Sequence, residues 1–148
     1  TEIIHLAQGA HGFPSVVDVN DEVFFAPTSM IQAVQDQCTR TRQLIPSTPG
    51  EVAECVYRSL AKSYAETTFQ IEQLTARKYS TIRIVGGGSQ DMYLNRLTQQ
   101  STGKKVYAGP VEATAIGNLL AQMIQAGEIA SVAEARKLVA RSFEPQSI

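Results

Sequence analysis

The chain has no tryptophan, only two cysteines and two histidines, and no long apolar run. Its 148 residues carry 13 Lys and Arg against 14 Asp and Glu, which gives a net charge of −1. So small a charge offers no attraction for a phosphate backbone or an anionic lipid surface, so we expect neither nucleic acid nor a membrane as partner. The apolar stretches are far shorter than the roughly 20 residues that span a bilayer. The length suits one domain.

The scarce cysteines and histidines also limit the chemistry. Cys38 and Cys55 lack metal-ligand spacing, and two such residues make no disulfide framework in a chain of this size. We expect both to be small buried residues in a protein of the reducing cytoplasm. His5 and His11 have no partner at a spacing typical of a metal site or a catalytic base, so they are interpreted as surface or locally bonded residues. No metal site is predicted.

The N-terminal region shows more turn signals than periodicity. Glycine, proline and an Asn-Asp pair interrupt the first 27 residues, so we expect irregular structure there, with short extended pieces at 15–19 and 23–25. A helix is then expected to begin at a cap provided by Thr28 or Ser29 and to run to about Arg42.

The strongest helix signal is Thr48-Pro49-Gly50-Glu51. Thr48 and Glu51 have the spacing of a capping box. Proline is favourable at the first helical position, because the backbone N–H that it lacks would have no partner within the helix. Apolar residues then recur at steps of three or four, which predicts a long helix to about Arg77. We expect Val56, Leu60 and Tyr64 to face inward, against a partner surface.

Two β-branched runs, residues 81–85 and 104–108, are predicted strands. Helices are expected after each strand and near the end of the chain, at about 90–101, 111–125 and 131–142. Strands separated by helices favour parallel pairing in an α/β layer. Two or three strands are too few for an independent parallel sheet, so we expect this layer to be part of a larger α/β protein.

Three consecutive glycines, Gly86, Gly87 and Gly88, join the first predicted strand to the next helix. Glycine permits a positive φ and the close approach of another group, and such a junction directs backbone N–H groups at a ligand, often a nucleotide. With Ser89 and Asp91 these residues form the predicted nucleotide-binding site. The alternative is a packing turn in which Ser89 and Asp91 only cap the helix. Neither the dinucleotide fingerprint nor a P-loop is present.

A second segment, residues 109–118, opens with Gly109-Pro110 and has small residues at 113, 115 and 117. Close helix packing explains most of this segment by itself, and Glu112 complements the dipole of the helix it opens. Together, residues 86–95 and 109–118 resemble the adenosine motif and the later connecting helix of the FGGY carbohydrate kinases, within the actin-like ATPase superfamily. Phe24-Phe25-Ala26-Pro27 and Ser47-Thr48-Pro49-Gly50-Glu51 are most similar to the rhamnulokinase branch. The likeness covers nearly the whole chain.

This resemblance implies an α/β fold in which residues 1–148 are the C-terminal portion of a two-domain sugar kinase, as part of an actin-like ATPase (ribonuclease H-like) domain. It implies ATP and Mg²⁺ as cofactors, a sugar substrate, and an N-terminal sugar- and phosphate-binding domain of the same polypeptide that this chain lacks. The family's general base is an Asp that commonly follows His. Because neither His5 nor His11 precedes Asp, no catalytic residue is expected in this chain.

The resemblance also implies a reaction. The full-length parent is expected to phosphorylate L-rhamnulose to L-rhamnulose 1-phosphate with ATP, and residues 1–148 alone are expected to be inactive. Another sugar is the near alternative. A noncatalytic nucleotide-binding or protein-interaction module of the same superfamily is the alternative from a different class. The family often has Asn where this chain has Asp91, and an ionised carboxylate cannot donate a hydrogen bond as an amide does.

Overall fold

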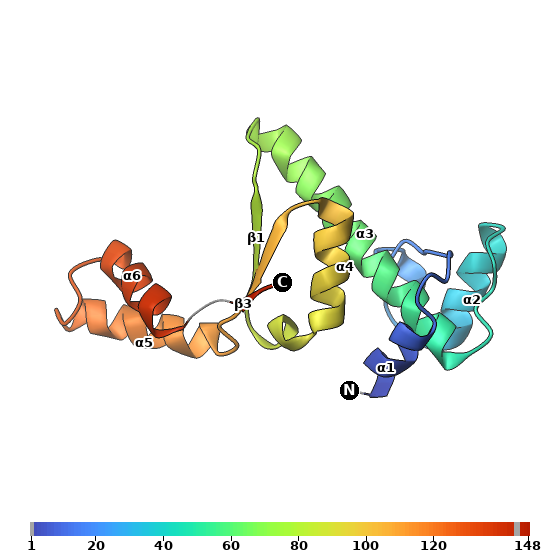
Figure 1. Ribbon diagram of the computed structural model, residues 1–148, viewed down its shortest axis with the longest axis horizontal. Coiled ribbons are helices and arrows are strands. Elements are labelled where there is room, and N and C mark those ends of the chain that lie inside the picture. The colour runs from blue at the N-terminus through green and yellow to red at the C-terminus, as the bar shows by residue number, and fades with distance from the viewer. Residues whose placement is uncertain (1, 144–145) are drawn as a thin grey trace. The chain divides into compact units, whose positions relative to one another are not determined.

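The computed structural model describes residues 2–143 and 146–148 (Figure 1). They form two compact units, one of residues 2–78 with 100–102 and one from the described residues of 79–99 and 103–148. Length alone favours a single domain, but each unit buries apolar residues of its own. In the first unit the elements are α1 (Glu2–Gly9), the 3₁₀ helix η1 (Glu22–Phe24), α2 (Met30–Arg40) and α3 (Pro49–Thr75).

The long helix α3 begins with the predicted capping box. Thr48 Oγ1 accepts from Glu51 N at 3.2 Å, and Glu51 Oε2 accepts from Thr48 N at 3.0 Å. Ser47 N also donates to Glu51 Oε2 at 2.7 Å, and this bond is the first cause of a lowered pKa of the Glu51 carboxyl. The start of α3 is therefore specified by residues within one turn of it, which is why sequence alone predicts it.

The irregular structure predicted for the N-terminal region is wrong for α1. This helix packs on α3 at Gly50, where an added Cβ would lie 2.6 Å from Leu6 O. Ala7 is fully buried. Such an eight-residue helix is too short to be stable by propensity alone, so contact with α3, distant in sequence, decides its conformation.

The extended piece predicted at 23–25 is also wrong, whereas the piece predicted at 15–19 forms no strand. Residues 15–18 lie in no helix or strand, and two of their N–H groups donate to side chains. Val16 N donates to Gln43 Oε1 at 2.9 Å, and Val17 N donates to Ser59 Oγ at 2.8 Å. Residues 22–24 form η1 because Asp21, at its N-cap, accepts from Val23 N at 3.1 Å.

The inward face of α3 differs from the prediction. Val56 and Leu60 are half-buried, but Tyr64 is 40% exposed. Other positions of the helix lie deeper, among them Cys55 and Ala61, which are buried. Small residues prevail there because they allow the close approach of the packed elements.

Apolar residues form a core cluster in the described part of the first unit. Its buried members are Phe13, Val17, Val34, Cys38 and Cys55. The expected burial of both cysteines is confirmed. Burial is the main cause that raises the pKa of the Cys55 thiol to about 12, and it raises the pKa of Cys38 as well.

The remaining elements are β1 (Thr81–Ile84), the 3₁₀ helix η2 (Gly87–Gln90), α4 (Met92–Thr102), β2 (Lys105–Ala108), α5 (Ala113–Gln125), α6 (Val132–Ser142) and β3 (Gln146–Ser147). The predicted strands and helices of this region are confirmed within a few residues. β1 pairs in parallel with β2, from Thr81 opposite Lys105 to Ile84 opposite Ala108. β3 pairs with β2 in the antiparallel direction and was not predicted. The α/β class is confirmed.

No helix in the described part of the chain combines the length and the apolar character that crossing a membrane requires.

Candidate functional site

The two glycine-containing turns lie side by side at the carboxyl ends of β1 and β2. Gly109 N donates to Ile84 O at 2.8 Å, and Gly86 N donates to Pro110 O at 3.0 Å. These two bonds extend the parallel ladder beyond the last paired residues of the strands. Ligands of α/β proteins bind at this edge of the sheet, beyond the carboxyl ends of parallel strands. The arrangement therefore brings the two sequence motifs to one place.

The three glycines of the first turn have different structural roles. Gly86 has φ +78°, in the region that side chains with a Cβ rarely adopt. Gly87 and Gly88 have no such φ, and an added Cβ at either would meet no described atom within 4 Å. Gly86 is thus required by the backbone, whereas Gly87 and Gly88 leave open space beside the turn.

The two polar residues of the predicted site hold the turn and the following helix. Ser89 is 4% exposed, and its Oγ donates to Gly86 O at 2.7 Å. Asp91 Oδ1 accepts from Leu94 N at 3.0 Å and caps α4. The helix cap expected in the alternative interpretation of this turn is present at Asp91.

A cavity of about 560 Å³ lies against this turn. Its wall combines residues that follow β1 with residues that follow β2: Ser89, Gln90, Met92, Ala108, Gly109, Pro110, Val111, Glu112 and Ile116, together with Phe143. Of the five predicted site residues, Ser89 lies on this wall. Gln90 and Glu112 were not among the predicted site residues, because Gln90 was only part of the motif at residues 86–95 and Glu112 was given a helix-dipole role. Parallel pairing of β1 and β2 could have indicated them, because it places the turn after β1 beside the turn after β2.

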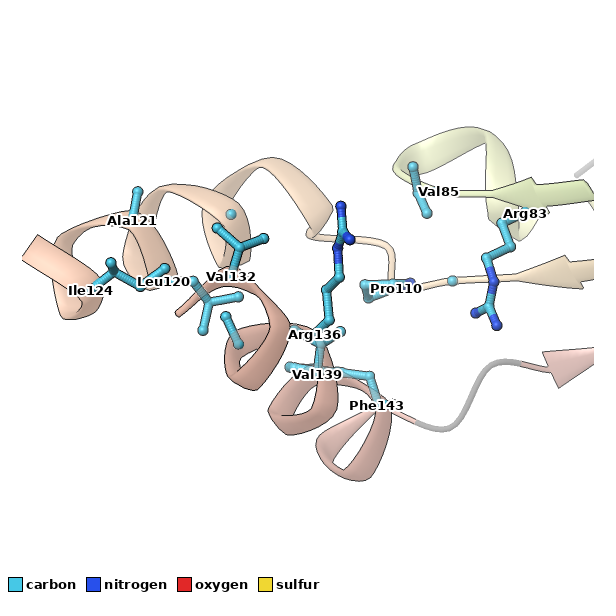
Figure 2. Close-up of a pocket in the computed structure, with 14 residues that line it drawn as sticks. Arg83, Val85, Pro110, Leu120, Ala121, Ile124, Val132, Arg136, Val139 and Phe143 are labelled. Carbon is cyan, nitrogen blue, oxygen red and sulfur yellow. The ribbon is translucent and has the colours of Figure 1, made fainter. Parts of the chain in front are cut away.

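A larger cavity, of about 710 Å³, lies where α5 and α6 meet the same edge of the sheet. Figure 2 shows its mostly apolar walls, with Leu120 and Ile124 from α5 and Val139 from α6. Arg83 of β1 and Arg136 of α6 contribute the charged side chains of this wall. The described lining includes no residue of 86–91, so size does not identify this cavity as the predicted site.

Among residues 2–143 and 146–148, no group of three or more His, Cys, Asp or Glu side chains is placed so that it could hold a metal ion. His11 is exposed at the surface, as expected, and its Nδ1 lies 3.6 Å from Glu54 Oε1. Glu54 is fully buried and also accepts from Gly12 N at 3.3 Å. Glu54 thus bonds the turn that follows α1, far in sequence from the glycine turns.

One family model matches the chain over residues 2–126: the FGGY family of carbohydrate kinases, C-terminal domain. The match includes the turn at residues 86–91 and the segment at 109–118 in full.

Curated relatives match almost the entire chain. A rhamnulokinase of Halalkalibacterium halodurans is 46% identical over 143 residues, covering 97% of this chain and 30% of the relative. A rhamnulokinase of Bacillus subtilis is 44% identical over 137 residues, covering 93% of this chain and 28% of the relative. A rhamnulokinase of Mannheimia succiniciproducens is 37% identical over 141 residues, covering 95% of this chain and 29% of the relative. The chain thus spans less than a third of the length of these relatives.

Proposed function

Since this chain belongs to the FGGY family of carbohydrate kinases, we propose that it forms the adenosine-binding side of an ATP-dependent sugar kinase. The observation that carries the proposal is the bond from Gly86 N to Pro110 O, because it joins the segment that resembles the family's adenosine motif to the one that resembles its later connecting helix. The proposed fold of the parent is the two-domain actin-like ATPase arrangement. Its proposed location is the cytoplasm.

The proposed nucleotide-binding residues are Gly86, Gly87, Gly88, Ser89 and Asp91. The open space beside Gly87 and Gly88 supports close approach of adenosine to the backbone at these two positions. Ser89 and Asp91 hold the turn in shape through the bonds to Gly86 O and Leu94 N. Gly86 provides the change of direction that only glycine accommodates easily.

ATP supplies the transferred phosphoryl group, and Mg²⁺ neutralises its charge. Mg²⁺ characteristically binds substrate phosphates and water with few protein ligands, so the metal is proposed to arrive with the nucleotide. No residue of this chain is assigned to it, in keeping with the lack of an acidic or histidine cluster among the described residues.

The proposed substrate is L-rhamnulose, phosphorylated to L-rhamnulose 1-phosphate. The support is that relatives 37–46% identical to this chain are named rhamnulokinase. The general base and the phosphate-binding loop are proposed to come from an N-terminal domain of the same longer polypeptide. In keeping with that, the chain covers only 28–30% of the length of the relatives compared. Residues 1–148 alone are proposed to be inactive.

The test is a kinase assay with the full-length polypeptide, ATP, Mg²⁺ and a panel of ketoses that includes L-rhamnulose. Formation of ADP and a sugar phosphate, fastest with L-rhamnulose, is expected. Fastest transfer to another ketose would keep the kinase and change its substrate. ATP binding without transfer to any sugar would favour the noncatalytic nucleotide-binding module. Turnover by residues 1–148 alone would contradict the proposed location of the base.

A further inference from the structure

The side chain of Asn95 connects α4 to the glycine turn. Its Nδ2 donates to the backbone carbonyl of Ser89 at 2.9 Å, across six residues of sequence. Asn95 is 1% exposed and Ser89 is 4% exposed, so water does not compete with this bond. A buried hydrogen bond of this kind fixes the conformation of the turn more firmly than an exposed one.

Asn95 also carries a structural penalty. Its Oδ1 is buried and finds no hydrogen-bond partner in the described residues. An unpaired buried acceptor is destabilising, and most buried polar groups in proteins are paired. An apolar residue at this position would avoid the unpaired oxygen but would lose the bond to Ser89. Stability alone therefore gives a weak reason for asparagine here, and the bond to the turn gives a stronger one.

The bond acts on the part of the turn where the nucleotide is proposed to bind. Ser89 N and Ser89 Oγ both contact Gly86 O, at 3.0 Å and 2.7 Å. With Ser89 O held by Asn95, Ser89 is fixed through three of its polar atoms. Gly87 and Gly88 lie between Gly86 and Ser89, so the residues on both sides of this glycine pair are held by hydrogen bonds. Ordering a flexible loop on binding lowers affinity, and ordering it beforehand avoids that loss.

We propose that Asn95 is a positioning residue for the nucleotide site: through Ser89 O, it orders the Gly87-Gly88 backbone before ATP binds. This inference rests on the proposed ATP site. It adds a residue that touches no substrate and acts only through the turn.

The test compares Asn95→Ala with Thr98→Val in the full-length enzyme. Thr98 is an equally buried residue of the same helix, and its Oγ1 donates to Leu94 O at 2.8 Å. Both variants remove a hydrogen bond that a buried side chain donates to a backbone carbonyl, but only Asn95→Ala removes the bond to the turn. The loss of one such bond predicts a rise of the ATP KM by roughly five- to tenfold in Asn95→Ala. The sugar KM and the kcat at saturating ATP are expected to stay within about twofold. Thr98→Val is expected to leave the ATP KM unchanged.

A second measurement follows the turn itself. Hydrogen exchange of the amides in residues 87–90 is expected to be faster in Asn95→Ala than in the wild type, and unchanged in Thr98→Val. Equal ATP KM values in the two variants, in an active wild-type enzyme, would overturn the positioning role while leaving the kinase proposal intact. A wild type that transfers no phosphate would instead contradict the proposed function.

If Asn95→Ala does not fold, Asn95→Ser takes its place, since a serine side chain is too short to reach Ser89 O. Failure of both variants to fold, beside a folded Thr98→Val, would assign Asn95 to the fold and overturn the inference.

Discussion

The backbone N–H of Gly86 donates to the carbonyl of Pro110 at 3.0 Å, so a residue of the first motif is bonded directly to one of the second. This bond lies beyond the last pair of β1 and β2 and belongs to neither strand. The position of Gly86, and with it the start of the glycine turn, is therefore set by the pairing of the strands.

The backbone of Gly86 gives the first prediction. Its φ of +78° is strained for any residue with a Cβ, although the nearest other atom to such a Cβ, Val111 O, is 4.0 Å away. Gly86→Ala should lower the free energy of unfolding by about 1–2 kcal/mol. Gly87→Ala is the control, because Gly87 has neither a positive φ nor a close neighbour among the described atoms. Urea unfolding measures both, and equal stability of the two variants would contradict this account of the turn.

The contact of α1 with α3 gives the second prediction. Alanine in place of glycine within a helix ordinarily stabilises it. At Gly50 the added Cβ would lie 2.6 Å from the backbone oxygen of Leu6, which cannot rotate away. Gly50→Ala should therefore destabilise the protein by about 1–3 kcal/mol. Gly9→Ala, in α1 with open space around it, should not. A stabilising effect of Gly50→Ala in urea unfolding would show that α1 does not pack there.

The capping box gives a pH-dependent prediction. The folded pKa of Glu51 is lowered, chiefly by the bond from Ser47 N, so its carboxylate contributes stability at pH values above the ordinary value of 4.5. This contribution is lost as the pH falls through the lower folded value. The stability difference between the wild type and Glu51→Gln should be largest near neutral pH and should shrink below about pH 4.5. Urea unfolding between pH 7 and pH 3 measures the difference, and one that stays constant over this range would contradict the prediction.

The buried thiol of Cys55 gives a prediction for high pH, where stability should fall as the pH rises, in contrast to the effect of Glu51. Its folded pKa is raised from 9.0 to about 12, chiefly by burial, so the neutral thiol is favoured in the folded protein. The stability that this provides is complete below pH 9 and is lost as the pH rises towards 12. Cys55→Ser should have a shallower fall in unfolding free energy above pH 9. A water-soluble thiol reagent should label Cys55 at pH 8 only after urea is added; rapid labelling of the native protein would contradict its burial.

Sequence predicted those elements whose signals are local. Thr48 and Glu51 specify the start of α3 from within one turn, and the β-branched run before Gly86 specifies β1. Sequence did not predict the elements whose conformation depends on contacts with residues distant in the chain. The helix α1 depends on contact with α3, and β3 has only two residues, too few for a periodic pattern.

The candidate site shows the same division. The glycines and the cap at Asp91 follow from residue type and spacing. The place of Glu112 on the cavity beside Ser89 does not, because it depends on the parallel pairing of two strands 24 positions apart in the register, as from Thr81 to Lys105. The bond from Asn95 to Ser89 O likewise depends on how α4 leaves the turn.

The most direct test of the nucleotide site is the ATP KM of Gly88→Val in the full-length enzyme. Gly88 has an ordinary φ and no described atom within 4 Å of an added Cβ, so valine should fold in place and occupy the space proposed for adenosine. Gly9→Val, at an equally open glycine of α1, is the matched control. The account predicts a rise of the ATP KM by roughly tenfold or more, equivalent to about 1.4 kcal/mol, with the sugar KM nearly unchanged. An ATP KM equal to that of Gly9→Val, in a variant whose folding circular dichroism confirms, would contradict it.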